Sequence, residues 1–152
     1  MFTISPKVVK CSASKLVTFI LTRLDMAYCV FDTDTNQEKN TIINKAIELA
    51  KKNRIIVITS SPCFEIWFLL HYIYTTASMS NDDVIKALKK HYSKYEKIIN
   101  IYPYIKENLN EAILRSKRLE QYHLNNNHTI GNIEANPNTE VYKVIEYLTK
   151  NN

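Results

Sequence analysis

The sequence Ala27-Tyr28-Cys29-Val30-Phe31 is a short apolar run of strand-forming residues, and Arg54-Ile55-Ile56-Val57-Ile58-Thr59 is a second one. Between them lies a predicted helix over 40–53, whose apolar stripe is Ile43, Ala46, Ile47 and Ala50. Strand, helix and strand in this order are typical of a parallel sheet covered by helices. We therefore predict an α/β fold with a parallel sheet flanked by helices.

The segments outside this unit follow the same spacing rules. Residues 2–9 alternate loosely, which favours a strand, and 16–23 carry apolar residues at helical spacing. The second half predicts helices that open at Pro62 and run to about residue 74, that span 80–100 and 106–122, and that follow Asn136-Pro137-Asn138-Thr139. The 152 residues are thus predicted to form one domain with a helical C-terminal half.

Composition excludes several classes of protein. The single glycine, Gly131, excludes glycine-rich phosphate loops. The longest apolar run, 64–70, is too short to cross a bilayer and contains Glu65, so we expect no membrane partner. Three cysteines without a Cys-x-x-Cys pair predict reduced thiols in a cytoplasmic protein. The net charge of +5, with a pI near 9.0, favours a polyanionic partner only weakly.

Two acids, Asp32 and Asp34, stand at the end of the first apolar strand. Residues two apart on a strand share a face, so these carboxylates could hold one Mg²⁺ or Mn²⁺ ion. The alternative is a solvated acidic turn that caps the next helix. An EF-hand loop is excluded, because Gln37 and Ile43 stand where that loop needs Gly and Glu. A haloacid-dehalogenase-type phosphatase, with Thr59 as its hydroxyl, remains a further alternative.

Glu65 lies in a segment that directly follows the second strand, and therefore at the same predicted edge of the sheet. It stands in the first turn of an otherwise apolar helix. The helix dipole favours a carboxylate there, but apolar neighbours make it costly unless it is paired or bound to metal. We interpret Glu65 as a site residue, against the alternative of a simple cap. His71 points to a different sector and is interpreted as a packing residue.

A basic stripe lies on the helix predicted over 80–100, formed by Lys86, Lys90, Lys94 and Lys97. Such charge with tyrosines at its margins is what a phosphate-backbone surface needs, and we predict DNA or RNA as the partner. The alternative is a solvated lysine face. Asn136 and Thr139 are explained as a helix entrance.

These segments, in this order, resemble the RloB-like family, whose domain is related to Toprim. The matching stretches are Val30-Phe31-Asp32-Thr33-Asp34, Ser61-Pro62-Cys63-Phe64-Glu65-Ile66-Trp67 and Asn136-Pro137-Asn138-Thr139, with a Tyr-x-Lys element at Tyr95-Glu96-Lys97 or Tyr92-Ser93-Lys94. The resemblance implies a Toprim-like parallel sheet and a metal site at Asp32 and Asp34. It also implies Mg²⁺-dependent phosphodiester cleavage of DNA or RNA, in phage defence by abortive infection.

The sequence departs from this resemblance at one place. Toprim domains carry a glutamate at the end of a first strand, whereas the only acid between Met1 and Asp32 is Asp25. The resemblance thus implies an N-terminally shortened member, in which Glu65 or a partner chain takes part of that role. Alternatively, the site is degenerate and the protein is a non-catalytic regulatory or interaction subunit. A missing strand would expose a sheet edge, which favours a homodimer or a partner subunit.

Overall fold

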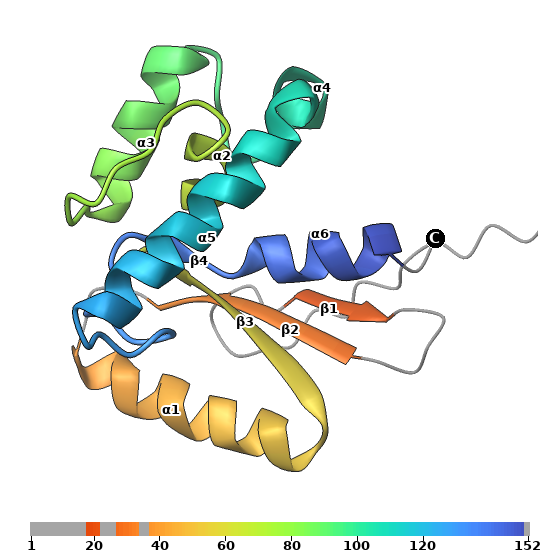
Figure 1. The fold of residues 1–152 in the computed structure, drawn as a ribbon, viewed down its shortest axis with the longest axis vertical. Coiled ribbons are helices and arrows are strands. Elements are labelled where there is room, and N and C mark those ends of the chain that lie inside the picture. Colours follow the sequence, from red (N-terminus) through yellow and green to blue (C-terminus); the bar gives the residue numbers. More distant parts are fainter. Residues whose placement is uncertain (1–17, 22–26, 34–36, 151–152) are drawn as a thin grey trace, which may run out of the picture.

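A computed structural model describes residues 18–21, 27–33 and 37–150 and shows an α/β fold built on a mixed sheet (Figure 1). The strands lie in the order β1 (Thr18–Leu21), β2 (Ala27–Asp32), β3 (Ile55–Ser61) and β4 (Asn138–Thr139). β2 and β3 are parallel, whereas β1 pairs antiparallel with β2 and β4 antiparallel with β3. The α/β prediction is confirmed, but the predicted parallel sheet is limited to the β2–β3 pair.

Helices lie on both faces of this sheet. α1 (Gln37–Lys52) covers one face, and α6 (Val141–Lys150) and α5 (Leu109–Asn125) lie on the other (Figure 1). Farther from the sheet, beside α5, lie α2 (Glu65–Leu69), α3 (Asn81–His91), α4 (Tyr102–Ile105) and the 3-10 turn η1 (Lys106–Asn108). Within the described part of the chain, every helix is too short or too polar to span a membrane.

The sheet core explains how the strand ends are placed. The partners Tyr28 and Ile56 belong to the cluster that packs against α2, α5 and α6, and so do Val30 and Ile58. Burying each large apolar side chain contributes about 1.5–3 kcal/mol before the cost of ordering the chain. The next partners two residues along, Asp32 and Ser60, lie on the same face because strand side chains alternate.

A second apolar core lies between α2 and α3. It contains Ile66 and Leu69 of α2 and Val84 and Leu88 of α3, all fully buried. Trp67 of α2 belongs to the sheet core instead. Because α2 lies between two cores, it is apolar on nearly every side, and Glu65 is its exception.

Two predicted helices differ from the structure. The helix expected over 16–23 is wrong, since Thr18–Leu21 is a strand paired with β2. Its Thr-Phe-Ile sequence has a high strand propensity, and pairing with β2 decides the outcome. The helix expected from Pro62 to about residue 74 is shorter, because α2 begins at Glu65 and ends at Leu69. The strand predicted over 2–9 lies outside the described residues.

The later helices are predicted better at their starts than at their ends. Ser80 caps α3 as expected, in a capping box with Asp83. α3 ends at His91 rather than near residue 100, because Tyr92 leaves the helical conformation (φ −135°, ψ 86°). The helix predicted over 106–122 corresponds to η1 and α5, and the helix after Thr139 to α6. The two-residue strand β4 was not predicted.

Candidate functional site

Glu65 is the first residue of α2 and is only 7% exposed. Its Oε1 accepts a hydrogen bond from the Tyr95 hydroxyl at 3.3 Å and lies 3.5 Å from the Lys97 Nζ. Tyr95 is buried, whereas the Lys97 side chain is 73% exposed. A buried carboxylate is costly unless it is paired, and here both residues of the Tyr-x-Lys element at 95–97 pair it. We call Glu65, Tyr95 and Lys97 the Glu65 cluster.

The Cys63 thiol is influenced both by Asp32 and by Glu65 of this cluster. Burial raises the pKa of the Cys63 thiol well above its usual range, and the carboxylates of Glu65 and Asp32 raise it further by repelling the thiolate. Burial and then the charge of Glu65 raise the pKa of Tyr95 in the same way. Cys63 and Tyr95 are therefore neutral near pH 7.

The carboxyl ends of β2 and β3 meet as the sequence predicted. Asp32 is half-buried beside its partner Ser60, and the Thr33 N–H donates to the Ser60 carbonyl at 2.8 Å. The hydroxyls of Ser60 and Thr139 lie 2.8 Å apart, which joins β4 to the same edge. Asp34 lies outside the described residues, so its pairing with Asp32 stays a prediction.

The residues of this edge can be tested against a divalent metal. Within the described ranges, no group of three His, Cys, Asp or Glu side chains is arranged to hold a metal ion. Mg²⁺, however, is commonly held by one or two carboxylates together with water and substrate phosphate. Asp32 at the end of β2 and Glu65, four residues after the end of β3, supply two carboxylates and fit that smaller requirement in number and chemistry. The contacts of Glu65 with Tyr95 and Lys97 both go to the same oxygen, Oε1, and the Cys63 thiol is a further hydrogen-bond partner of this carboxylate.

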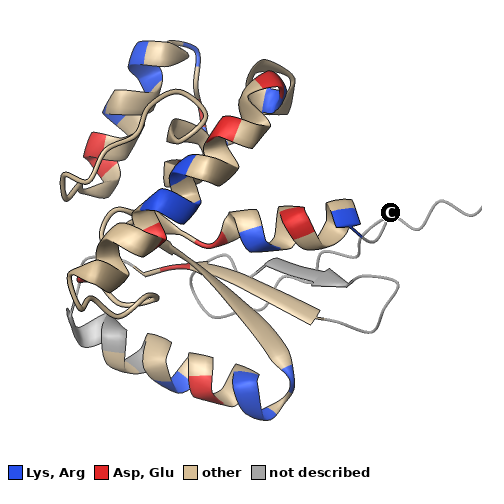
Figure 2. Ribbon diagram, in the orientation of Figure 1, with Lys and Arg blue, Asp and Glu red and all other residues tan. Residues whose placement is uncertain are grey.

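The four predicted nucleic-acid lysines are all exposed, but they do not form one helical stripe. Lys86 and Lys90 lie on α3, which Figure 2 shows with positive residues along it. Lys94 and Lys97 follow the helix, so the prediction that they share its face is wrong. Lys97 lies instead beside Glu65, at the candidate site.

His71, Asn136 and Thr139 have structural contacts. His71 is buried, and its Nδ1–H donates to the Trp67 carbonyl at 2.9 Å. The Asn136 amide donates to the Met79 carbonyl at 2.9 Å and accepts from the Met79 N–H at 3.1 Å, which fixes the loop before α3. Thr139 Oγ1 accepts from the first amide of α6 at 3.3 Å, as expected for a helix entrance.

A second carboxylate, Glu140, was not identified from the sequence. Thr59 donates to its Oε2 from the backbone N–H at 3.1 Å and from Oγ1 at 2.7 Å. Because Thr59 alternates with Ser60, its hydroxyl lies on the opposite face of the sheet from Asp32. This geometry counts against the phosphatase alternative, which needs the two groups side by side. No local pattern signals a contact between residues this far apart in sequence.

Glu140 belongs to a larger network that holds α6. Lys143 Nζ lies 2.7 Å from Glu140 Oε1 and 3.0 Å from Glu120 Oε1, and the Tyr142 hydroxyl donates to Glu120 Oε2 at 2.6 Å. Burial alone would lower the pKa of Lys143, yet the hydrogen bonds and charges of Glu140 and Glu120 raise it overall. We call Glu120, Glu140, Tyr142 and Lys143 the Glu140 cluster; it ties α6 to α5 and β3.

The fold and the site together define an α/β domain with carboxylates at the carboxyl ends of its parallel strands. The family model described as RloB-like protein matches residues 6–148. The chain therefore belongs to the RloB-like protein family, as its sequence resemblance predicted. Neither the curated proteins nor the solved structures contain a match to it.

Proposed function

We propose that the chain is a Toprim-like, Mg²⁺- or Mn²⁺-dependent nuclease-type domain that cleaves phosphodiester bonds of DNA or RNA in cytoplasmic phage defence. One observation carries this proposal: Asp32 ends β2 beside Ser60 of the parallel strand β3, and the buried Glu65 opens the helix that follows β3. Ligands of open α/β sheets bind outside the carboxyl ends of the strands. The position of Asp32 and Glu65 near this edge supports the proposal.

The described residues suggest a division of roles. Asp32, with Asp34, would hold the divalent ion, which when bound stabilises negative charge on the attacked phosphate. Glu65 would complete the site around the ion and orient the attacking water, because Tyr95 and Lys97 hold its carboxylate at one oxygen. Lys97 would contact the phosphate backbone at the site, while Lys86, Lys90 and Lys94 would hold it farther away.

A cleavage assay tests the proposal. End-labelled single- and double-stranded DNA and RNA are incubated with the protein and Mg²⁺, and the products are separated on gels. We expect cleavage that chelation stops and that Asp32→Asn or Glu65→Gln lowers by about 10²–10⁴-fold. Glu96→Gln is the matched control, since Glu96 is exposed and lies between Tyr95 and Lys97. Undiminished cleavage by Glu65→Gln, or cleavage in chelator, would contradict the proposal.

A second candidate function is a non-catalytic regulatory or interaction subunit. The ion pair between Lys97 and Glu65 favours it, because this pair already neutralises the carboxylate. Among the described strands, β4 pairs only with Ser60 and Ser61, so the rest of that edge of β3 could receive a second copy or a partner chain. A stable homodimer or complex that neither cleaves nucleic acid nor binds Mg²⁺ would support this candidate instead.

A further inference from the structure

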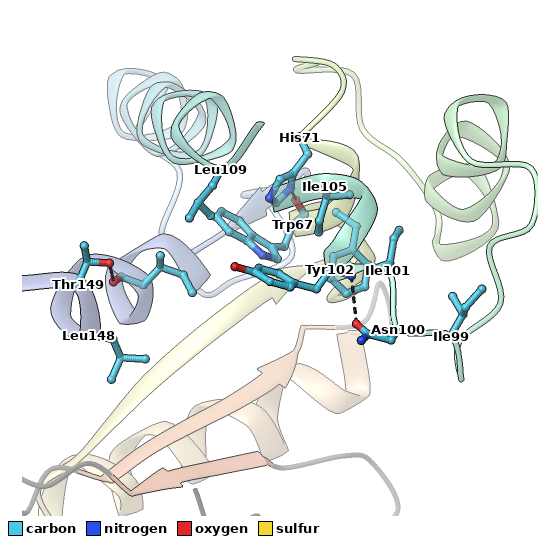
Figure 3. Close-up of a pocket in the computed structure, with 12 residues that line it drawn as sticks. Trp67, His71, Ile99, Asn100, Ile101, Tyr102, Ile105, Leu109, Leu148 and Thr149 are labelled. Carbon is cyan, nitrogen blue, oxygen red and sulfur yellow. Dashed lines mark hydrogen bonds between the residues drawn. The ribbon is translucent and has the colours of Figure 1, made fainter. Parts of the chain in front are cut away.

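A cavity of about 390 Å³ lies beside α2, bounded by α4 and α6 (Figure 3). Its walls include Trp67, Tyr102, Ile105 and Leu148, and its volume is within the roughly 300–1,000 Å³ typical of small-molecule sites. None of the residues of the Glu65 cluster lines it. We call this space the Trp67 cavity.

His71 gives the Trp67 cavity a polar group. The ring lines the cavity and is only 2% exposed. A carbonyl oxygen can only accept, so the 2.9 Å contact with the Trp67 carbonyl places the His71 proton on Nδ1 and leaves Nε2 as an acceptor. The side chain also hydrogen-bonds to the backbone of Phe68, whose carbonyl can accept only from the same Nδ1–H, so Nε2 keeps its lone pair. Burial also lowers the pKa of His71, which keeps Nε2 unprotonated near pH 7.

The wall of the cavity carries an exposed ring, and two lysines flank this wall in the sequence. Tyr102 is 60% exposed although it lines the cavity. Lys97 and Lys106 flank the segment 99–105, which contributes to one wall, but neither lines the cavity. Their side chains are 73% and 51% exposed and form long ion pairs, with Glu65 at 3.5 Å and Glu107 at 3.8 Å, which a phosphate could replace. Aromatic rings flanked by cations are the means by which proteins hold single-stranded nucleic acid. An uncharged apolar ligand would have no use for the two lysines.

We propose that the Trp67 cavity receives one unstacked nucleobase of a single-stranded nucleic acid, which stacks on Tyr102 and donates an N–H to His71 Nε2. Every nucleobase carries such a donor on its pairing edge, so the site would tolerate any sequence. This inference rests on the proposed function, because it takes nucleic acid as the ligand. It adds that the ligand is a single strand or a base extruded from a duplex.

The only tryptophan of the chain, Trp67, reports directly on this cavity. The full chain is titrated, without divalent metal, with a six-nucleotide single-stranded DNA and with an abasic oligomer of equal length and charge. Affinity is measured by the anisotropy of a label on the oligomer, and Trp67 emission is followed in parallel. We expect the DNA to quench Trp67, and the abasic oligomer to bind about 5- to 100-fold more weakly without quenching.

Two tyrosines of α4 provide a matched pair of variants. Tyr102 and Tyr104 are 60% and 57% exposed, and only Tyr102 lines the cavity, whereas Tyr104 packs against the ring of Tyr92. Both replacements should leave the fold intact, which circular dichroism verifies. We expect Tyr102→Ala to bind the DNA no better than the abasic oligomer, and Tyr104→Ala to keep the difference.

The outcomes separate this inference from the proposed function. Equal affinity for both oligomers, unaffected by Tyr102→Ala, would overturn the cavity assignment and leave nucleic-acid binding standing. Binding of neither oligomer would overturn both. A change of Trp67 emission with protein concentration alone would assign the cavity to a second copy of the chain and overturn the inference.

Discussion

The Glu65 cluster and the Glu140 cluster use the same residue types in different geometry. In the first, Tyr95 and Lys97 lie 3.3 Å and 3.5 Å from the carboxylate, and the lysine is 73% exposed. In the second, Tyr142 and Lys143 lie 2.6 Å and 3.0 Å from Glu120, and the lysine is 38% exposed.

The difference separates a carboxylate with structural contacts from the one that we propose to be functional. The short contacts of the Glu140 cluster join β3, α5 and α6 and saturate Lys143 with two carboxylates. The Glu65 cluster joins α2 to a loop through a 3.3 Å hydrogen bond from Tyr95 and a 3.5 Å ion pair with Lys97, and an ion pair with so exposed a lysine contributes little to stability. A buried carboxylate that is held loosely near strand ends is available to a ligand.

The largest expected effect on stability comes from the Glu140 cluster. Glu140→Ala removes the acceptor of two Thr59 hydrogen bonds and leaves Lys143 short of one partner. We expect it to lower the free energy of unfolding by about 2–4 kcal/mol, measured by urea denaturation. Glu65→Gln keeps an acceptor for the Tyr95 hydroxyl, so it should lower the free energy of unfolding by less than about 1 kcal/mol. Equal losses in the two variants would break the comparison.

Replacing Lys143 or Lys97 gives a smaller but sharper contrast in stability between the two clusters. Lys143→Met should cost about 1–3 kcal/mol because it strands two partly buried carboxylates, and Lys97→Met less than about 0.5 kcal/mol. If Lys97 contacts phosphate, Lys97→Met should also reduce the salt slope of oligonucleotide binding by about one unit. A salt slope identical to that of the wild type would remove Lys97 from the interface.

How much of this could be predicted from the sequence depends on the range of the interactions. β2, α1 and β3 were predicted because each one shows its own apolar pattern within a few residues. The end of α3 was not predicted. The chain leaves the helix after His91, and Tyr95 then contacts Glu65, which lies thirty residues earlier in the sequence. The strand β4 has two residues and no pattern of its own.

The candidate site shows the same limit. Glu65 was predicted to be a site residue because a carboxylate among apolar neighbours is costly unless it is paired or bound to metal. The Tyr-x-Lys element was noted only through the family resemblance, and its contact with Glu65 required the three-dimensional structure. Glu140 was missed because its partner Thr59 lies 81 residues away and a glutamate at a helix entrance is ordinary.

The smallest expected effect is a pH dependence of stability that comes from His123 of α5, the helix that also carries Glu120 of the Glu140 cluster. His123 of α5 is buried, its Nε2–H donates to the Pro137 carbonyl at 2.8 Å, and its Nδ1 lies 3.0 Å from His128 Nδ1. Burial, and then the charge of His128, lowers the pKa of His123. As pH falls through the ordinary histidine value of 6.5, the unfolded chain binds a proton that the native protein resists, so stability declines.

Unfolding measured between about pH 7.5 and 5.5 tests this dependence. His71 contributes in the same direction, because burial lowers its pKa too. We therefore expect His123→Gln to flatten the decline without abolishing it. Tyr95→Phe should keep the wild-type decline. The pKa of Tyr95 is raised above its ordinary value, so its hydroxyl does not titrate in this pH range. A wild-type slope in His123→Gln would show that another group causes the acid sensitivity.

The central claim, that Asp32 and Glu65 serve one divalent ion, is tested most directly by calorimetric titration with Mg²⁺. The wild type and Glu96→Gln should bind the ion with the same affinity, whereas Asp32→Asn and Glu65→Gln should each lose at least about tenfold, or 1.4 kcal/mol. No heat of binding in the wild type at millimolar Mg²⁺, or equal affinity in all four proteins, would contradict the account.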